Sequence, residues 1–289
     1  MHRPILLLSN ISMIMELVIN SQLQKYVMRH HLISDRYFGF RPHHSTADIV
    51  TIFSQQRSNA LDRGYELRLI AFNFKGAFDK VWHKGPCFKL KEKGISGKWL
   101  AWIENYLSNW SIQVVLSGQS SSIFPINASV PQGSILGPLL FSILIDDLGN
   151  EPENPLYLYA DDSTLFCEIR SSDDGEAVTA SLNRDRYRMT SCADKWKVTF
   201  EQSKCKAMSI SRKWNPTRFD LFFGSTKLAE KNALEILGVT VDCKLTRTKH
   251  VSNIAARARQ NLGALLGKEE PPSTRPRSVV SWNTHHFVG

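Results

Sequence analysis

Cysteine is scarce in this sequence, and its few copies are scattered. The five cysteines are Cys87, Cys167, Cys192, Cys205 and Cys243. Because their number is odd and no two of them form a Cys-x-x-Cys pair, the sequence favours neither a zinc knuckle nor a disulfide framework. We therefore expect reduced thiols and an intracellular protein, in the nucleus or the cytoplasm.

A long apolar run is also missing. The most apolar stretch near the amino terminus, residues 5–19, is interrupted by Ser9, Asn10, Ser12 and Glu16. A membrane-spanning helix needs ~20 consecutive apolar residues, and no small-residue cleavage site follows the stretch, as a signal peptide would require. We expect no membrane association.

Acidic residues are fewer than basic residues. Lysine and arginine together number 36 against 27 for aspartate and glutamate, which gives a net charge of +9 and a pI near 9.3. This surplus favours an anionic partner such as nucleic acid, although many soluble proteins share it. The length of 289 residues suits one large domain or two small ones.

The most informative stretch runs from Pro155 to Phe166. Residues 156–159 and 164–166 have the aromatic and aliphatic character of strands, and the turn pair Asp161-Asp162 lies between them, so the stretch predicts a tight hairpin. Two adjacent carboxylates repel each other and lose solvation, a cost that a cation offsets, so the tip is a candidate Mg²⁺ site. The alternative is a solvated turn, because aspartate is a common turn residue.

Apolar periodicity predicts several further elements. An amphipathic core helix is expected over residues 5–29. Its buried face would begin with Ile11, Ile14, Met15, Val18 and Ile19. Strands over 112–116 and 122–126 are expected to cross the main sheet, and a last amphipathic helix reaches from 251 to 265. The pair Asp146-Asp147 follows an apolar helix, where carboxylates are unfavourable, so we expect it to be solvated and assign it no metal.

Two stretches before the hairpin complete a larger pattern. Residues 67–82 run from an apolar strand into Ala77-Phe78-Asp79-Lys80-Val81-Trp82, and residues 130–134 form a polar loop, Val130-Pro131-Gln132-Gly133-Ser134, that feeds an apolar helix. The turn Phe38-Gly39-Phe40-Arg41-Pro42 precedes them, and Leu237-Gly238-Val239 follows the hairpin. In this order and spacing the stretches resemble the reverse transcriptases of non-LTR retrotransposons, the jockey-like long interspersed elements. The resemblance extends from Arg3 to Val239.

The resemblance implies an α+β fold, the fingers and palm of a polymerase right hand, in which an antiparallel palm sheet is backed by helices. Residues 1–243 would form the reverse transcriptase domain, with fingers truncated at the amino terminus, and 244–267 would begin a truncated thumb. Residues 268–289 are expected to be a disordered tail, because the stretch starts charged and Pro-rich.

The implied activity is RNA-directed DNA polymerisation. Its partners would be an RNA template, a DNA primer and deoxynucleoside triphosphates, with no obligate protein partner evident. Its cofactors would be two Mg²⁺ ions, with Mn²⁺ as a possible substitute. The catalytic and metal-binding positions implied by the resemblance are Asp161, Asp162 and Asn73, with Lys204 assisting the departure of pyrophosphate. For Lys204 an ordinary solvated side chain is the alternative.

Other roles implied by the resemblance concern the nucleotide and the primer. Arg41 would meet the triphosphate, and Phe78 would block a ribose 2′-hydroxyl. The loop residues Gln132 and Gly133 would line the nucleotide sugar and base. Leu237 and Gly238 would belong to the primer grip. For Arg41 the alternative is a surface charge.

Asn73 departs from the family pattern. The family carries a third catalytic aspartate six residues before the aspartate of Ala-Phe-Asp, and that position is Asn73 here. An asparagine carbonyl still ligates Mg²⁺ but brings no negative charge, so its attraction to the ions falls by several kcal/mol at an effective dielectric of ~20. Because a barrier rise of ~1.4 kcal/mol slows a reaction tenfold, we expect impaired polymerisation. Asp79 is no obvious substitute, since it lies more than a turn further along the chain.

Two alternatives of different class remain beside the polymerase. One is a catalytically inactive nucleic-acid-binding remnant of a mobile element, which keeps the basic groove and has lost turnover. The other is an untranslated or unstable relic. Arg247 stands where the family tends to show tryptophan, and together with the missing ends it favours a fragment or a decayed copy.

Overall fold

The protein is described here by a computed structural model. It covers residues 9–116, 119–130, 133–170, 173, 175–213, 221–223, 226–243, 246, 248–265 and 279–283. Within these residues no helix combines the length and the apolar character that crossing a bilayer requires.

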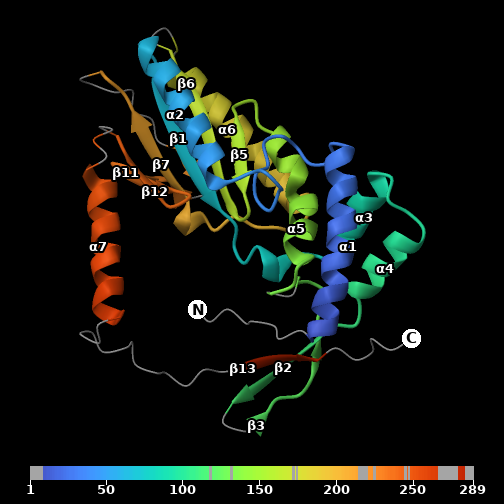
Figure 1. Cartoon of the computed structure of the whole chain (residues 1–289). Helices are drawn as coiled ribbons and strands as arrows, with labels where there is room; N and C mark the ends of the chain where they lie inside the picture. Colours follow the sequence, from blue (N-terminus) through green and yellow to red (C-terminus); the bar gives the residue numbers. More distant parts are fainter. Residues whose placement is uncertain are drawn as a thin grey trace.

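A five-stranded sheet forms the centre of the fold (Figure 1). In spatial order its strands are β10 (Ala229–Glu230), β7 (Lys206–Ile210), β1 (Glu66–Asn73), β6 (Asp162–Ile169) and β5 (Leu156–Tyr159). Strands β7, β1, β6 and β5 are antiparallel as predicted, but β10 pairs in parallel with β7. The sheet is therefore mixed, and the prediction of an antiparallel sheet is wrong at this edge. The short hairpin of β8 (Phe222–Phe223) and β9 (Thr226–Lys227) reverses the chain before β10 joins.

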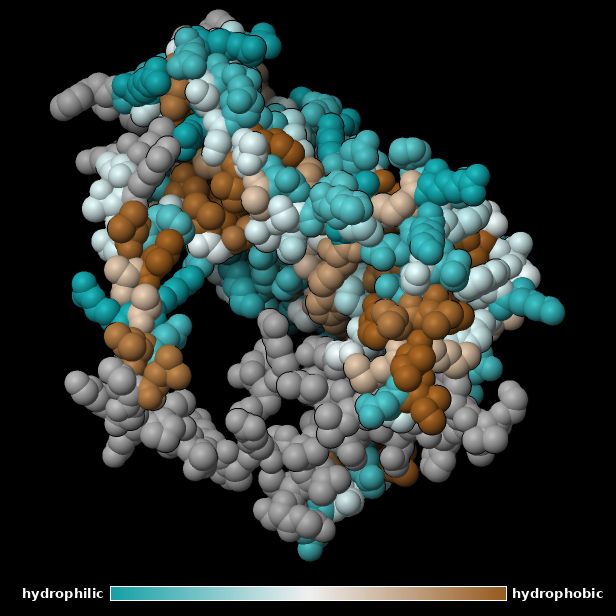
Figure 2. Space-filling view, viewed as in Figure 1, coloured by the Kyte–Doolittle hydropathy of each residue, from teal (hydrophilic) through white to brown (hydrophobic). Residues whose placement is uncertain are grey.

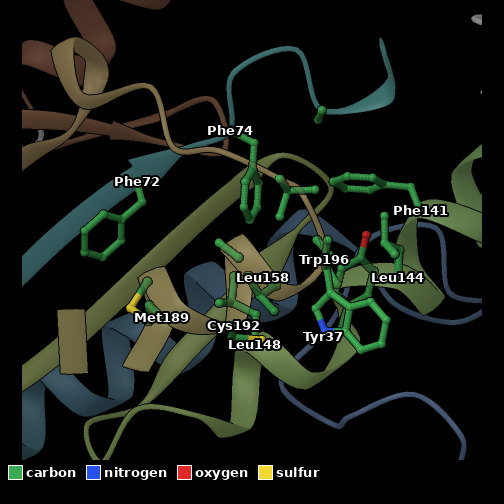
Figure 3. Packing of buried hydrophobic residues seen from close by; sticks show 14 of the residues in the cluster. Tyr37, Phe72, Phe74, Phe141, Leu144, Leu148, Leu158, Met189, Cys192 and Trp196 are labelled. Atoms are coloured by element: carbon green, nitrogen blue, oxygen red, sulfur yellow. The ribbon is translucent and has the colours of Figure 1, made fainter. Parts of the chain in front are cut away.

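Apolar side chains cover both faces of the sheet, because β1 alternates between two cores. Ile70 and Phe72 face a cluster that includes α5 (Gly137–Ile145) and α6 (Gly175–Lys195), the side shown in Figure 3. Leu67 and Leu69 face a second cluster, which includes Phe53 and the hairpin of β11 (Ala233–Ile236) and β12 (Val239–Asp242). Helix α2 (Thr46–Asp62) begins at a capping box, in which the Asp48 carboxylate accepts a hydrogen bond from the Ser45 amide at 2.6 Å.

The first helix, α1 (Asn10–Arg29), begins later than predicted, after Ser9 caps it. Its predicted buried face is wrong over the first half: Ile11 is 81% exposed and Ile14 63%. The buried residues of α1 are Glu16, Leu23 and Val27. Figure 2 shows an apolar patch over this helix. Periodicity placed the apolar residues on one stripe, but only the carboxyl half of α1 packs its stripe against the core.

Helices α3 (Lys84–Glu92) and α4 (Lys98–Tyr106) lie on the α1 side of the molecule (Figure 1). Strand β2 (Ser111–Leu116) follows them and pairs with β3 (Gln119–Ser120), β4 (Phe124–Pro125) and β13 (Val279–Asn283) in a separate sheet. The prediction that strands 112–116 and 122–126 cross the main sheet is therefore wrong. Strand β13 lies within residues 268–289, for which a disordered tail stays a prediction. An alternating pattern identifies a strand but not its partner.

Asp146 and Asp147 open the short helix η2 (Asp146–Asn150), and the prediction that the pair is solvated is wrong for Asp146. Asp146 is buried and contacts the Lys93 ammonium at 2.9 Å, and Asp147 contacts that of Lys89 at 2.9 Å. Asp147 also accepts a hydrogen bond from the Trp196 indole at 3.2 Å. Lys89 belongs to α3 and Lys93 directly follows its last residue, and both lie more than fifty residues before the aspartates in sequence. Together they tie α3 to the end of α5.

Candidate active site

The predicted hairpin at Asp161-Asp162 is confirmed. Strands β5 and β6 pair from Leu156↔Leu165 to Tyr159↔Asp162, and the residues at the turn are Ala160 and Asp161. Ala160 has a φ of 53°, a left-handed conformation that a non-glycine residue adopts in tight turns. The two carboxylates thus lie at one end of the main sheet.

Asn73 faces the hairpin across the neighbouring strand, as a metal site shared with Asp161 and Asp162 requires. It ends β1 directly opposite Asp162, and its side-chain amide donates a hydrogen bond to an Asp162 carboxylate oxygen at 3.0 Å. The backbone fixes this register, because the Phe74 amide donates to the Asp161 carbonyl at 3.3 Å and the Glu201 amide donates to the Asn73 carbonyl at 2.8 Å. The position is confirmed, whereas a role in metal binding stays a prediction.

The electrostatic surroundings of Asp162 oppose its ionisation. Its pKa is raised, chiefly because neighbouring protein atoms remove part of its solvent, and the hydrogen bond from Asn73 works against this rise. The charges of Asp161 and Glu235 raise the pKa further, while that of Lys204 lowers it. Lys204 is exposed at the end of the short helix η3 (Gln202–Lys204), so the predicted lysine is close enough to act on this carboxylate. Its role in pyrophosphate departure stays a prediction.

Glu235 is a member of this charge cluster that sequence reasoning missed. It lies on β11 and forms an ion pair with Arg257 of α7 (Thr248–Leu265), with 2.9 Å between the charged atoms. No local pattern distinguishes it from other surface glutamates. Its ion pair connects α7 to the strand pair beside the hairpin.

The turn before α2 packs directly on the hairpin. The Phe38 amide donates to the Leu158 carbonyl at 2.8 Å, and a Cβ added to Gly39 would lie 2.4 Å from the Ala160 nitrogen. Only glycine fits so close to another backbone. Arg41 is 9% exposed, and its guanidinium donates to the Ser34 and Tyr37 carbonyls, each at 2.9 Å. The structure therefore places Arg41 inside its own turn, and its contact with a triphosphate stays a prediction.

Phe78 and the loop before α5 are brought together through the backbone. The Phe78 carbonyl, in the short helix η1 (Phe78–Lys80), accepts a hydrogen bond from the Val130 amide at 2.9 Å. The half-buried Phe78 ring lies 5.1 Å from the ring of Phe141. Gly133 has a φ of 109°, which favours glycine, while Gln132 lies outside the described residues. The nucleotide-binding roles of Phe78, Gln132 and Gly133 stay predictions.

Glu16 supports this loop from α1, and sequence reasoning treated it only as an interruption of an apolar run. Its carboxylate is 2% exposed and accepts hydrogen bonds from the amides of Ile135 at 2.7 Å and Leu136 at 3.2 Å. The Tyr106 hydroxyl donates to the other oxygen at 3.2 Å. Burial raises the pKa of Glu16, and the three hydrogen bonds oppose that rise. A carboxylate from one helix therefore caps the start of another, α5.

Leu237 and Gly238 form the turn of the β11–β12 hairpin. Their φ angles are 49° and 86°, as a two-residue hairpin turn with positive φ at both positions requires. The structure places this turn at the end of a hairpin that packs on the main sheet through Leu234 and Ile236. A role as primer grip stays a prediction.

The donor atoms at the hairpin suit a hard divalent cation only in part. Asp161 and Asp162 supply carboxylate oxygens, whereas Asn73 uses its amide nitrogen as a donor toward Asp162. Among the residues that the structure describes, no group of three or more histidine, cysteine, aspartate or glutamate side chains could hold a metal ion. That Asn73 stands at the position of a third catalytic carboxylate stays a prediction.

Sequence comparison decides the family. Residues 1–241 match the reverse transcriptase (RNA-dependent DNA polymerase) family. The chain belongs to this family. Its curated relatives include the probable RNA-directed DNA polymerase from transposon X-element of Drosophila melanogaster, which is 28% identical over 89% of this chain and 28% of the relative. The RNA-directed DNA polymerase from mobile element jockey of the same species is 29% identical over 88% of this chain and 28% of the relative.

The reverse transcriptase is thus of the non-LTR retrotransposon type, and the chain spans about 28% of the length of these relatives. Its fold is similar to that of telomerase from Candida tropicalis in complex with a fragment of telomeric RNA. That likeness has a TM-score of 0.55 at 15% identity and covers 80% of this chain and 38% of the telomerase. The likeness confirms a shared mixed α+β fold.

The raised pKa of Asp162 leads to a prediction about stability. A carboxylate whose pKa is raised by folding loses stabilising free energy as pH rises from its unfolded pKa through its folded one. Asp162→Asn should therefore be more stable than the parent at neutral pH without metal, by less than about 1 kcal/mol because the side chain is accessible to solvent. Urea unfolding at several pH values measures the difference, which should vanish below the ordinary pKa of aspartate. A less stable variant at neutral pH would contradict it.

Proposed function

We propose that this reverse transcriptase carries a two-metal nucleotidyl-transfer site at the tip of the β5–β6 hairpin, with catalysis impaired by Asn73. The juxtaposition of Asp161 and Asp162 with the end of β1 supports this site most directly. In this assignment the main sheet is the palm within residues 1–243, α2 and the turn before it belong to the fingers, and residues 244–267 begin the thumb.

Each residue then has a definite task. Asp161 and Asp162 would hold the ions, and two Mg²⁺ ions, when bound, lower the charge cost at the attacking and leaving oxygens. Asn73 orients Asp162 through its hydrogen bond but adds no charge. Lys204 would offer a cation to the departing pyrophosphate, and Phe78 would restrict the space beside the nucleotide sugar.

The templates and substrates follow from the same proposal. An RNA template and a DNA primer would contact lysine and arginine side chains, which outnumber the acidic ones, and deoxynucleoside triphosphates would enter beside Phe78 and the loop that carries Gln132 and Gly133. Leu237 and Gly238 would contact the primer strand from the β11–β12 turn. The Arg41 guanidinium already donates hydrogen bonds to two carbonyl groups. Its main contribution to triphosphate binding would therefore be to hold the turn before α2 against the hairpin.

Primer extension tests this function. The purified chain, an RNA template and a DNA primer should give weak extension that requires Mg²⁺ or Mn²⁺, and Asp161→Asn should abolish it. Asp194→Asn is the matched control, because Asp194 is an exposed aspartate on α6 outside the proposed site. Extension that persists in Asp161→Asn would remove the hairpin from catalysis.

A nucleic-acid-binding remnant is the second candidate, and the amide at position 73 is the observation that favours it. Binding depends on distributed lysine and arginine contacts to phosphates, so it should outlast catalysis and weaken steeply with salt. Filter binding to a primer-template between low and physiological salt measures this dependence. No affinity at low salt would reject both candidate functions.

A further inference from the structure

A large hollow opens on the chain away from the hairpin. Its volume is about 960 Å³, and residues from α3, α4, β4 and the end of α6 line it. None of Asp161, Asp162, Asn73 or Lys204 is among its lining residues. This volume is in the range of pockets that bind organic molecules. The proposed polymerase site gives the hollow no role.

Aromatic rings form the floor and one wall of the hollow. Trp196 and Trp110 are buried beneath it, at 3% and 4% exposure, whereas Phe88 is 51% exposed. The rings of Phe88 and Trp196 are 6.2 Å apart, so Phe88 extends the aromatic floor toward solvent. Leaving half of a phenylalanine in water forgoes the stabilisation that full burial would bring. An exposed ring at the mouth of a hollow is therefore available to a ligand.

Positive charge surrounds this ring. Lys84, Phe88 and Lys91 follow one another at helical spacings of four and three on α3, so they share one face. Lys195 reaches the hollow from α6, with its ammonium 4.7 Å from the centre of the Trp196 ring. Among the described residues that line the hollow, Glu104 is the one acidic residue. In the described part of the chain no ion pair joins Lys84, Lys91 or Lys195 to another residue.

We propose that this hollow is a second binding site for single-stranded nucleic acid. One base stacks on Phe88, and Lys84, Lys91 and Lys195 contact the flanking phosphates. An aromatic platform beside a cationic rim is the arrangement that binds single strands without sequence preference, because every base has a flat face. An acidic peptide would use the lysines but would leave the exposed ring without a flat partner. The site does not depend on metal chemistry at the hairpin.

Fluorescence anisotropy with a labelled ten-residue oligouridine tests the proposal. Phe88→Ala should weaken binding about tenfold, which lies in the lower part of the range for removing an aromatic side chain that stacks on a base. The triple variant Lys84→Gln, Lys91→Gln, Lys195→Gln should reduce the slope of log affinity against log salt by about 2, since each phosphate contact on a single strand contributes ~0.7. Phe222→Ala and the triple Lys25→Gln, Lys98→Gln, Lys231→Gln are matched controls, because these side chains are exposed outside the hollow and should leave binding unchanged.

A crosslink locates the bound strand. Oligonucleotides that carry 4-thiouridine should crosslink to the α3 peptide of the parent, and Phe88→Ala should lose this crosslink while remaining folded by circular dichroism. Unchanged binding and crosslinking in both hollow variants would overturn the proposal. Phe88-dependent binding of an oligoglutamate, with no binding of oligouridine, would overturn it as well. Primer-template binding is measured in parallel. If the chain binds oligouridine but not the primer-template, the result counts against the polymerase function and not against the hollow.

Discussion

Asn73→Asp should raise RNA-templated primer extension at least tenfold above the parent, because a barrier lowered by only ~1.4 kcal/mol already gives that factor. The substitution restores a negative charge opposite Asp162 with little change in volume. At an effective dielectric of ~20 the attraction between that charge and a divalent cation is worth several kcal/mol. Steady-state extension at graded Mg²⁺ concentrations measures the gain, and the metal requirement should shift to lower concentration.

The structure adds a second consequence of this substitution. Asn73 now donates a hydrogen bond to Asp162, and an aspartate there would place two carboxylates against each other. Without metal the variant should therefore be less stable than the parent, and Mg²⁺ should restore its stability through binding to the folded state. Asn105→Asp, an exposed change on α4, is the control for added charge. A folded Asn73→Asp protein that binds primer-template and remains as inactive as the parent would show that Asn73 is not the limiting defect.

Glu16→Ala should lower the free energy of unfolding by at least about 3 kcal/mol, since three polar groups lose their acceptor and each buried polar group left without a partner costs ~1–3 kcal/mol. The variant removes the acceptor of the Ile135 and Leu136 amides and of the Tyr106 hydroxyl. Glu16→Gln keeps an acceptor oxygen and should lose much less. Urea unfolding compares both variants with Glu92→Ala, an exposed glutamate of α3 whose loss should have little effect.

The direction of the Glu16 pKa adds a test by pH. Because folding raises this pKa, the parent loses stability as pH rises from the unfolded pKa through the raised one. Glu16→Gln has no such charge to bury, so it should gain relative to the parent over the same range. If both glutamate variants unfold like the parent at every pH, the carboxylate does not support the start of α5.

Local sequence was enough for the elements whose pattern is complete within a short stretch. The strands on either side of Asp161-Asp162 form where predicted. The position of Asn73 opposite Asp162 was also predictable, but through family resemblance, since no local rule pairs β1 with β6. The comparisons confirm the family itself on most of the chain.

Contacts between distant segments could not be predicted in the same way. Ile11 and Ile14 lie on the apolar stripe that was expected to be buried, yet they are exposed, while Glu16 between the apolar positions of α1 is buried. The sequence predicts a solvated carboxylate at Asp146, but the structure places Lys93, 53 residues away in sequence, beside it. The β10 edge strand, the separate β2 sheet and the hollow beside Phe88 could not be predicted for the same reason, because each depends on contacts between distant segments. Periodicity reports which residues share a face of an element, and only the packed chain determines what that face meets, because burial and pairing depend on neighbours that the local pattern does not contain.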